Sequence, residues 1–160
     1  MYLLIGAALV FFSAAYVGMA AASLHCLRVK QLEAFCSLIA HIGAQIDGFL
    51  TPLDEIFRTY NDPLLVKLGF LGSVGDAGYM EAFEKCGSRI YLKSSETAVL
   101  RSFFDGLGHT SAASEVKHCL LFEKKLSEIA GKARSELAQK MKICRVLGII
   151  IGIMLVVILL

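Results

Sequence analysis

Residues 147–160 read LGIIIGIMLVVILL, an apolar run without a single charge. A second such run, MYLLIGAALVFFSAAYVGMAAASL, occupies residues 1–24. Every Lys, Arg, Asp and Glu lies between Arg28 and Arg145, although charged residues make up 19% of the chain. The sequence is therefore a charged middle between two apolar ends, and these ends limit the folds that the middle can adopt.

The first apolar run is long enough to cross a bilayer as a helix, which takes about 20 apolar residues. A cleaved secretory signal is the alternative, since Met19–Ser23 offers small residues for cleavage. However, no Lys or Arg precedes the run, and the run is longer than the roughly 7–15 apolar residues of a signal core. We predict a retained transmembrane helix over residues 1–24.

The second apolar run is shorter. Residues 146–160 span about 22 Å as a helix, against a hydrocarbon core of about 30 Å. A helix that starts at Ile143, with Lys142 and Arg145 reaching toward the headgroups, spans about 27 Å. Local thinning of the bilayer can absorb the remaining difference from the hydrocarbon core. A buried C-terminal helix would need a core around every face. We predict a transmembrane helix over residues 146–160.

Basic residues flank both runs on the side of the charged middle: Arg28, Lys30, Lys140, Lys142 and Arg145. Such flanks favour the cytoplasmic side of a membrane. We therefore expect residues 25–145 to form a cytoplasmic domain, with both termini outside. The net charge of +2, without a basic stripe interleaved with aromatic residues, does not predict nucleic acid as a partner.

The sequence carries no recognisable catalytic motif. It has no phosphate-binding loop, no G-x-S-x-G and no H-E-x-x-H. The five cysteines form no C-x-x-C pair, which favours buried thiols over a disulfide framework. We predict no enzyme activity and no cofactor. The alternative is a small membrane-bound enzyme or metal-dependent sensor that uses His109, His118 and Cys119, although adjacent helical residues such as His118 and Cys119 point about 100° apart.

The middle is typical of an all-α domain. Apolar residues between His25 and Gly48 recur at helical spacing: Leu32, Phe35, Cys36, Ile39, Ile42 and Ile46. A second seam, close to heptad spacing, predicts a long helix from about Ser111 to Arg145: Val116, Cys119, Leu126, Ala130, Ala133, Leu137 and Cys144. Nothing breaks either helix before the neighbouring apolar run. We predict a small helical bundle over residues 25–145 between the two transmembrane helices.

Shorter signals predict the helices between these two. In LTPLDEIF (50–57), Thr51 can cap a helix, Pro52 suits its first position, and Asp54 with Glu55 complement the positive helix start. The turn YNDP (60–63) should start another short helix, and GSVGDAG (72–78) should be a flexible connection. Two further helices should cover DAGYMEAFEKCGSRIYL and SSETAVLRSFF, the second capped by Ser94 or Ser95.

FFDGLGHTSAASEVKH (103–118) should be a helix end, a bend and a helix start. Gly106 and Gly108 can adopt the left-handed conformation at the helix end, and Thr110 or Ser111 can cap the next helix. In the apolar ends, small residues recur every four positions at Ala14, Gly18, Ala22, Gly148 and Gly152. Such positions favour close helix packing in lipid, between the two spans or between copies of the chain.

Taken together, these stretches resemble the stage III sporulation protein AB family. The resemblance rests on AQIDGFLTPLDEIF, FFDGLGHTSAASEVKH and RVLGIIIGIMLVVILL, which occur in the family's order between an N-terminal span and an apolar tail. The matching positions are Thr51, Pro52, Leu53, Leu107 and Gly108. Ser111 and Glu115 depart from the expected Asp and Gln, so a capping or recognition role carried by that Asp is not carried over to this chain.

The resemblance implies a membrane complex that links the mother cell to the engulfed forespore. The helical domain of such proteins is similar to that of inner-membrane platform proteins of type II secretion and type IV pilus systems. The implied partners are a cytoplasmic ATPase encoded alongside and other channel- or ring-forming subunits. We expect a partner-binding surface of low charge near the T-P-L and G-L-G turns, including Asp54 and Glu55.

Overall fold

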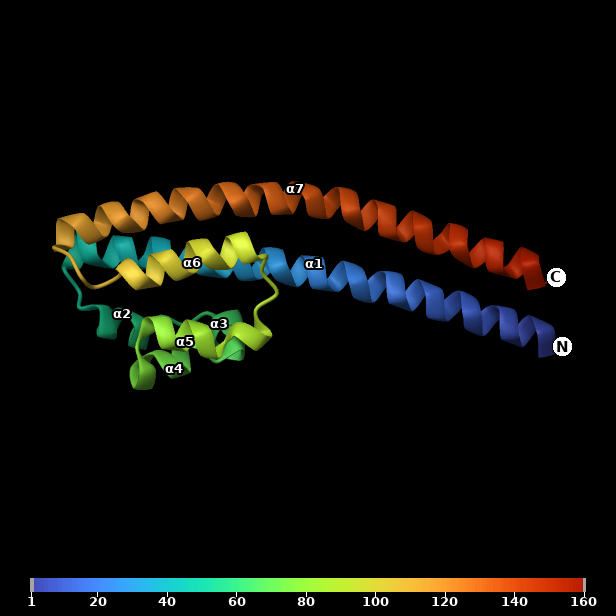
Figure 1. Cartoon of the computed structure of the whole chain (residues 1–160), viewed down its shortest axis with the longest axis horizontal. Coiled ribbons are helices and arrows are strands. Elements are labelled where there is room, and N and C mark those ends of the chain that lie inside the picture. Colours follow the sequence, from blue (N-terminus) through green and yellow to red (C-terminus); the bar gives the residue numbers. More distant parts are fainter. Residues whose placement is uncertain (1, 160) are drawn as a thin grey trace. The chain divides into compact units, whose positions relative to one another are not determined.

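The structure is a computed structural model. It describes the backbone of residues 2–159 and the side chains of residues 23–139, 141–143, 146, 150 and 154. Within these limits the chain forms seven α-helices and one 3₁₀ helix and no strand: α1 (Tyr2–Phe49), α2 (Leu53–Thr59), α3 (Pro63–Leu68), α4 (Phe70–Ala77), α5 (Tyr79–Lys85), η1 (Gly87–Arg89), α6 (Ser94–Gly106) and α7 (Ala112–Leu159). The predicted all-α class is confirmed (Figure 1).

The chain divides into two compact units. The first unit contains residues 1–27 and 133–160, and the second unit contains residues 28–132. The predicted spans over 1–24 and 146–160 fall mostly on residues whose side chains are not described. The packing positions Ala14, Gly18, Ala22, Gly148 and Gly152 lie wholly outside the described side chains. Among the residues that could be searched, no helix combines the length and the apolar character that crossing a membrane requires.

The core of the second unit is built on the two predicted apolar stripes. Leu32, Phe35 and Ile42 of α1 are fully buried. On α7, Leu126 is fully buried and Cys119 is 1% exposed. The two helices approach closely, because a Cβ added at Gly43 would lie 3.1 Å from the Cβ of Cys119. Figure 1 shows α2 to α5 on the side of α1 and α6 opposite to α7.

An aromatic cluster joins the short helices to α1. The ring of Phe35 meets the rings of Phe70 on α4, Phe83 on α5 and Phe104 on α6 edge to face, with centroids 5.7, 5.8 and 6.3 Å away. Such pairs contribute about 0.5–1.5 kcal/mol each beyond the apolar area they bury. One α1 residue therefore anchors three of the short helices.

The predicted flexible connection over GSVGDAG is wrong. Most of it belongs to α4, which runs from Phe70 to Ala77 after Gly69 adopts a left-handed conformation at φ +82°. Phe70 and Val74, one helical turn apart, are 0% and 7% exposed. Burying these two side chains contributes about 1.5–3 kcal/mol each, which outweighs roughly 1 kcal/mol for each glycine in the helix.

Two capping predictions are also wrong. Pro52, not Thr51, occupies the N-cap of α2, and the Thr51 hydroxyl bonds the Gln45 side chain at 3.3 Å instead. Neither Ser94 nor Ser95 caps α6, which begins at Ser94. The backbone N–H of Lys93 instead donates to the Glu96 carboxylate at 2.9 Å. At α2 no side chain makes a cap bond, and at α6 the Glu96 carboxylate bonds the backbone in front of the helix.

Candidate functional site

The candidate site lies at the end of the second unit where α1 ends and α7 begins. Helix α1 ends at Phe49, and the next residue, Leu50, adopts the left-handed conformation at φ +51° although it is not a glycine. The backbone N–H groups of Leu50 and Thr51 bond the carbonyls of Ile46 and Gln45 at 3.1 and 3.4 Å. A left-handed leucine costs on the order of 1 kcal/mol, and such strain clusters at functional sites.

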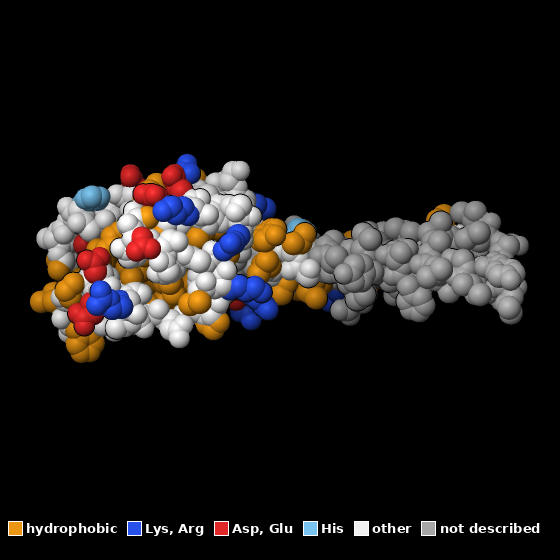
Figure 2. Space-filling model, turned by 90° about the horizontal axis from the view of Figure 1, so that it is seen from below, with side chains coloured by type: hydrophobic (Ala, Val, Ile, Leu, Met, Phe, Trp, Pro, Cys, Tyr) orange, Lys and Arg blue, Asp and Glu red, His pale blue; other side chains and the backbone are white. Residues whose placement is uncertain are grey.

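This helix end leaves large apolar side chains in solvent. Phe49 and Leu50 are 76% and 73% exposed, although both follow the buried stripe of α1. Figure 2 shows hydrophobic side chains at the left end of the second unit, where Figure 1 places the end of α1 and the start of α7. Because neighbouring exposed aromatic and aliphatic side chains are typical of protein-binding sites, this end is the candidate partner surface.

The second motif turn is held by a buried carboxylate. Glu115 is only 4% exposed, and its Oε1 accepts bonds from the Gly108 N–H at 3.0 Å and from the Thr110 N–H and hydroxyl at 3.1 and 3.0 Å. Gly108 has the predicted left-handed conformation at φ +86°, whereas Gly106 is the last residue of α6 and has no positive φ. The carboxylate thus fixes the bend between α6 and α7.

The two motif turns meet. A Cβ added at Gly108 would lie 3.3 Å from Cδ1 of Leu53, so the G-L-G turn packs directly on the T-P-L turn. Leu107 is 3% exposed and belongs to the core, whereas Pro52 lies at the surface. The structure therefore brings the matching positions together, some as surface and some as the support beneath it.

Acidic residues border this surface. Asp54 and Glu55 lie in the first turn of α2 and are exposed. The Tyr79 hydroxyl donates to Asp54 Oδ1 at 3.0 Å, and burial together with this carboxylate raises the pKa of Tyr79 to about 12. We call the exposed group Phe49, Leu50, Pro52, Asp54, Glu55 and Gly108 the end surface.

The three residues of the alternative site have different environments. His109 is exposed, whereas the His118 ring stacks on Phe103 with centroids 5.2 Å apart and meets Phe122 edge-on at 4.7 Å. Cys119 is 1% exposed, and burial, then the charge of Glu115, raises its thiol pKa to about 11. A thiol that holds its proton this firmly is a poor metal ligand or nucleophile at neutral pH.

No group of three or more His, Cys, Asp or Glu side chains able to hold a metal occurs in the part of the chain that the structure describes. His118 does lie beside a carboxylate: its Nδ1 is 3.9 Å from Glu115 Oε2, and both atoms are buried without a hydrogen-bond partner. A Cβ added at Gly106 would lie 3.0 Å from Cε1 of His118, so this ring packs against the last residue of α6 before the bend.

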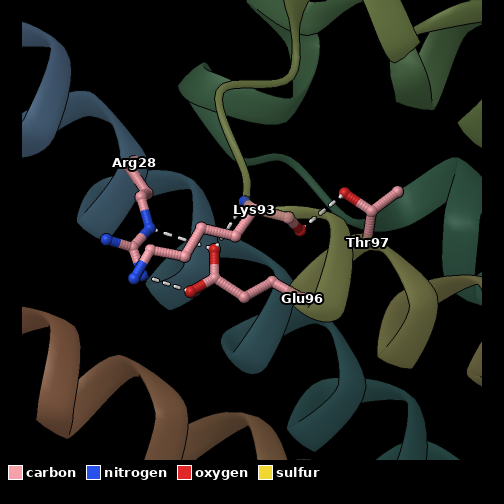
Figure 3. Close-up of polar contacts among 4 residues, drawn as sticks. All are labelled: Arg28, Lys93, Glu96 and Thr97. Atoms are coloured by element: carbon pink, nitrogen blue, oxygen red, sulfur yellow. Dashed lines mark hydrogen bonds and ion pairs between the residues drawn. The ribbon is translucent and has the colours of Figure 1, made fainter.

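Sequence reasoning missed the buried polar residues that position these helices. In Figure 3, Arg28 of α1 donates through Nε to Glu96 Oε2 at 3.0 Å and through Nη2 to Oε1, and the Lys93 N–H also donates to this carboxylate. Gln31, 1% exposed, donates to the Arg89 carbonyl at 3.0 Å and accepts from the Tyr91 N–H at 2.8 Å. These contacts fasten α6 and the loop before it to α1.

The fold and the site define a small all-α domain on two long helices, with its two motif-bearing turns packed together at one end. The family model for stage III sporulation protein AB matches residues 3–65 and 75–160, and the chain belongs to this family. Membership implies a role in stage III of sporulation. The comparisons with curated proteins and with solved structures found no match.

Proposed function

We propose that the protein is a membrane-anchored platform subunit of a channel or secretion-like complex between mother cell and forespore, and that its end surface binds a cytoplasmic ATPase. The observation that carries the proposal is the contact between the T-P-L and G-L-G turns beside the exposed Phe49 and Leu50. Burying one such side chain against a partner contributes roughly 1.5–3 kcal/mol. In this proposal the subunit has no catalytic activity, and the ATPase supplies the energy.

The proposed location is the mother-cell membrane facing the forespore, with the helical domain in the cytoplasm and both termini outside. Support comes from the uncharged ends and from the basic residues that flank them. Other channel or ring subunits and further copies of this chain are the proposed partners within the bilayer. The small residues at Gly148 and Gly152 would serve helix packing there.

Substitutions on the end surface test the ATPase contact. Phe49→Asp, and Asp54→Arg combined with Glu55→Arg, should abolish co-purification of the ATPase and reduce sporulation, because they place charge in the contact or reverse its sign. Val66→Asp is the matched control for the first variant: Val66 is 53% exposed and lies outside the family match. Asp76→Arg, on the exposed part of α4, is the control for the second.

Helical circular dichroism of each variant separates loss of binding from loss of folding, which matters because Asp54 bonds Tyr79. If the end-surface variants fold, retain the ATPase and sporulate normally, the ATPase binds elsewhere. If the controls lose the ATPase as well, the effect is not specific to the end surface.

Accessibility of a single cysteine tests the location of the domain. Lys125→Cys, in a background without the five native cysteines, places a thiol at an exposed position of α7. A membrane-impermeant thiol reagent should label it only after lysis if the domain is cytoplasmic. Labelling in intact cells would put the domain on the other side of the membrane and remove the ATPase contact.

A further inference from the structure

The outward side of α7 in the second unit carries a second patch of exposed apolar side chains. Leu120 and Leu121 are 66% and 64% exposed, whereas Cys119 and Leu126 of the same helix are buried against the core. Most of each leucine side chain is in solvent, and the second unit covers only the remainder. They therefore need a different explanation from the buried seam beside them.

Lysines surround this patch. On a helix the surface neighbours of a residue lie three and four positions away, and for Leu121 these include Lys117, Lys124 and Lys125. All three lysines are exposed, and none forms an ion pair with another residue that the structure describes. The Lys125 Nζ lies 5.9 Å from the centroid of the Phe122 ring, so its stem runs along the helix surface.

The acidic residue nearest in sequence, Glu123, lies on the α1 side of the helix. It is half-buried, and its backbone carbonyl accepts a hydrogen bond from the Cys36 Sγ of α1 at 3.8 Å. Burial, and after it the charge of Glu123, raises the pKa of the Cys36 thiol. The Glu123 carboxylate thus acts on the α1 side of the helix. On the outward side, Glu128 is exposed four positions after Lys124 and three after Lys125, so it offsets part of the charge of the three lysines, and an excess of positive charge remains.

We propose that Lys117, Leu120, Leu121, Lys124 and Lys125, here called the α7 basic face, bind an acidic amphipathic segment of another protein. Apolar side chains of that segment would cover the two leucines, and its carboxylates would pair with the three lysines. Burial gives such a contact its affinity, and complementary charge gives it orientation and selectivity. The end surface carries acidic residues, whereas the α7 basic face carries lysines, so the two surfaces favour different partners. The proposal for the α7 basic face therefore does not depend on the ATPase contact.

A lipid surface fits this face less well than an acidic protein segment does. A helix that lies in a bilayer interface buries a broad apolar face. Here only two leucines are exposed, Glu128 is exposed one turn further along, and the opposite side of the helix is buried in the core. The patch has the width of a contact with one helix or one extended segment.

Photocrosslinking in the full chain tests this proposal. A photoreactive phenylalanine analogue replaces Leu121 in sporulating cells, and mass spectrometry identifies the species attached to it. We expect a peptide of a different protein that carries several Asp or Glu residues within about two helical turns of the attachment point. Lipid, a second copy of this chain, a peptide without acidic residues, or no adduct would each overturn the proposal.

Charge variants make the test specific. The triple variant Lys117→Glu, Lys124→Glu, Lys125→Glu should lower the adduct yield at least about tenfold, because each reversed charge now repels the segment. The triple Lys→Arg variant at the same positions should keep the adduct, and so should Lys67→Glu on α3, which is exposed elsewhere. An adduct that survives the triple reversal contradicts the proposal.

Crosslinking in cell lysates at increasing salt provides a second measurement with the three lysines unchanged, in case the reversed variant folds poorly. The adduct yield should fall as salt screens exposed charges. A yield that does not change with salt would show that the lysines do not select the partner.

Discussion

Glu96→Gln should destabilise the second unit by about 3 kcal/mol, close to the cost of breaking one side of a buried ion pair. The side chains of Glu96 and Arg28 are 4% and 11% exposed. The carboxylate accepts both Arg28 bonds and the Lys93 N–H, as Figure 3 shows. A glutamine offers one acceptor oxygen and turns an amide donor toward the other Arg28 donor, so the guanidinium loses the charge of Glu96 and one of its two bonds to this side chain.

The expected shift is large enough to measure in the full chain. With a urea dependence of about 1.5 kcal/mol/M, a loss of about 3 kcal/mol moves the unfolding midpoint by about 2 M. Urea-dependent proteolysis reports this midpoint. Glu84→Gln is the matched control. Its ion-pair partner Arg101 is 57% exposed and Glu84 itself is 53% exposed, so this pair should contribute less than about 1 kcal/mol.

The pH dependence gives an independent check. Burial opposes ionisation of Glu96, but the hydrogen bonds from Arg28 and Lys93 and the nearby positive charges outweigh it and hold the pKa of this carboxyl below its ordinary value. A carboxyl whose folded-state pKa is depressed contributes its full stability above the unfolded pKa of about 4.3 and loses it as the pH falls through the folded pKa. The gap between the wild type and Glu96→Gln should therefore close in acid.

Two results would refute this reasoning. One is a gap that stays constant or widens as the pH falls below about 4.3. The other is a Glu84→Gln variant that lowers the free energy of unfolding as much as Glu96→Gln does.

The variant Arg28→Met combined with Glu96→Leu should be more stable than Arg28→Met alone, because it leaves no buried charge without a partner.

Further substitutions probe the other contacts of the second unit. Glu115→Ala should cost about 2–4 kcal/mol, because it removes the acceptor of three hydrogen bonds, and hydrogen exchange should rise at Thr110. Gln31→Leu should cost about 2 kcal/mol and speed exchange in the loop before α6, which it holds through two backbone bonds. Gly43→Leu should lower the urea midpoint by about 1 M or more, since no space exists between it and Cys119. The native Cys119 thiol should resist alkylation at pH 8 until urea unfolds the chain, because its pKa is about 11.

Helical periodicity in the sequence was sufficient to predict the long elements. Leu32, Ile39 and Ile42 recur at helical spacing and are all buried, because only one face of α1 can be covered by its neighbours. Periodicity failed over GSVGDAG, where helix formation depends on the burial of Phe70 and Val74 rather than on local preference. Tertiary packing makes this segment helical. The sequence of seven residues alone gives no information about that packing.

The site was predictable as two separate turns but not as one surface. The contact between Leu53 and Gly108 joins residues far apart in sequence, and no local pattern indicates it. Phe49 and Leu50 continue an apolar helix, so the sequence gives no sign that both remain exposed. In the sequence, Glu115 stands out only as a departure from the family pattern, although it is the residue that fixes the G-L-G turn.

The buried polar residues share one structural task, which bears on how the end surface could work. Gln31 holds the loop before α6, Glu96 holds the first turn of α6, and Glu115 holds the turn after it. Each desolvated polar group costs stability unless its bonds are complete, so a core that served stability alone would favour apolar residues there. What these bonds provide is a fixed position for α6 and for the turn that packs on Leu53. A binding surface whose turns are fixed beforehand loses less conformational entropy on association, which suits a subunit proposed to bind an ATPase that supplies the energy. If loosening the G-L-G turn by Glu115→Ala weakens ATPase co-purification while Phe49 and Leu50 are intact, this positioning is what the partner requires; unchanged co-purification would leave Glu115 with a role in stability alone.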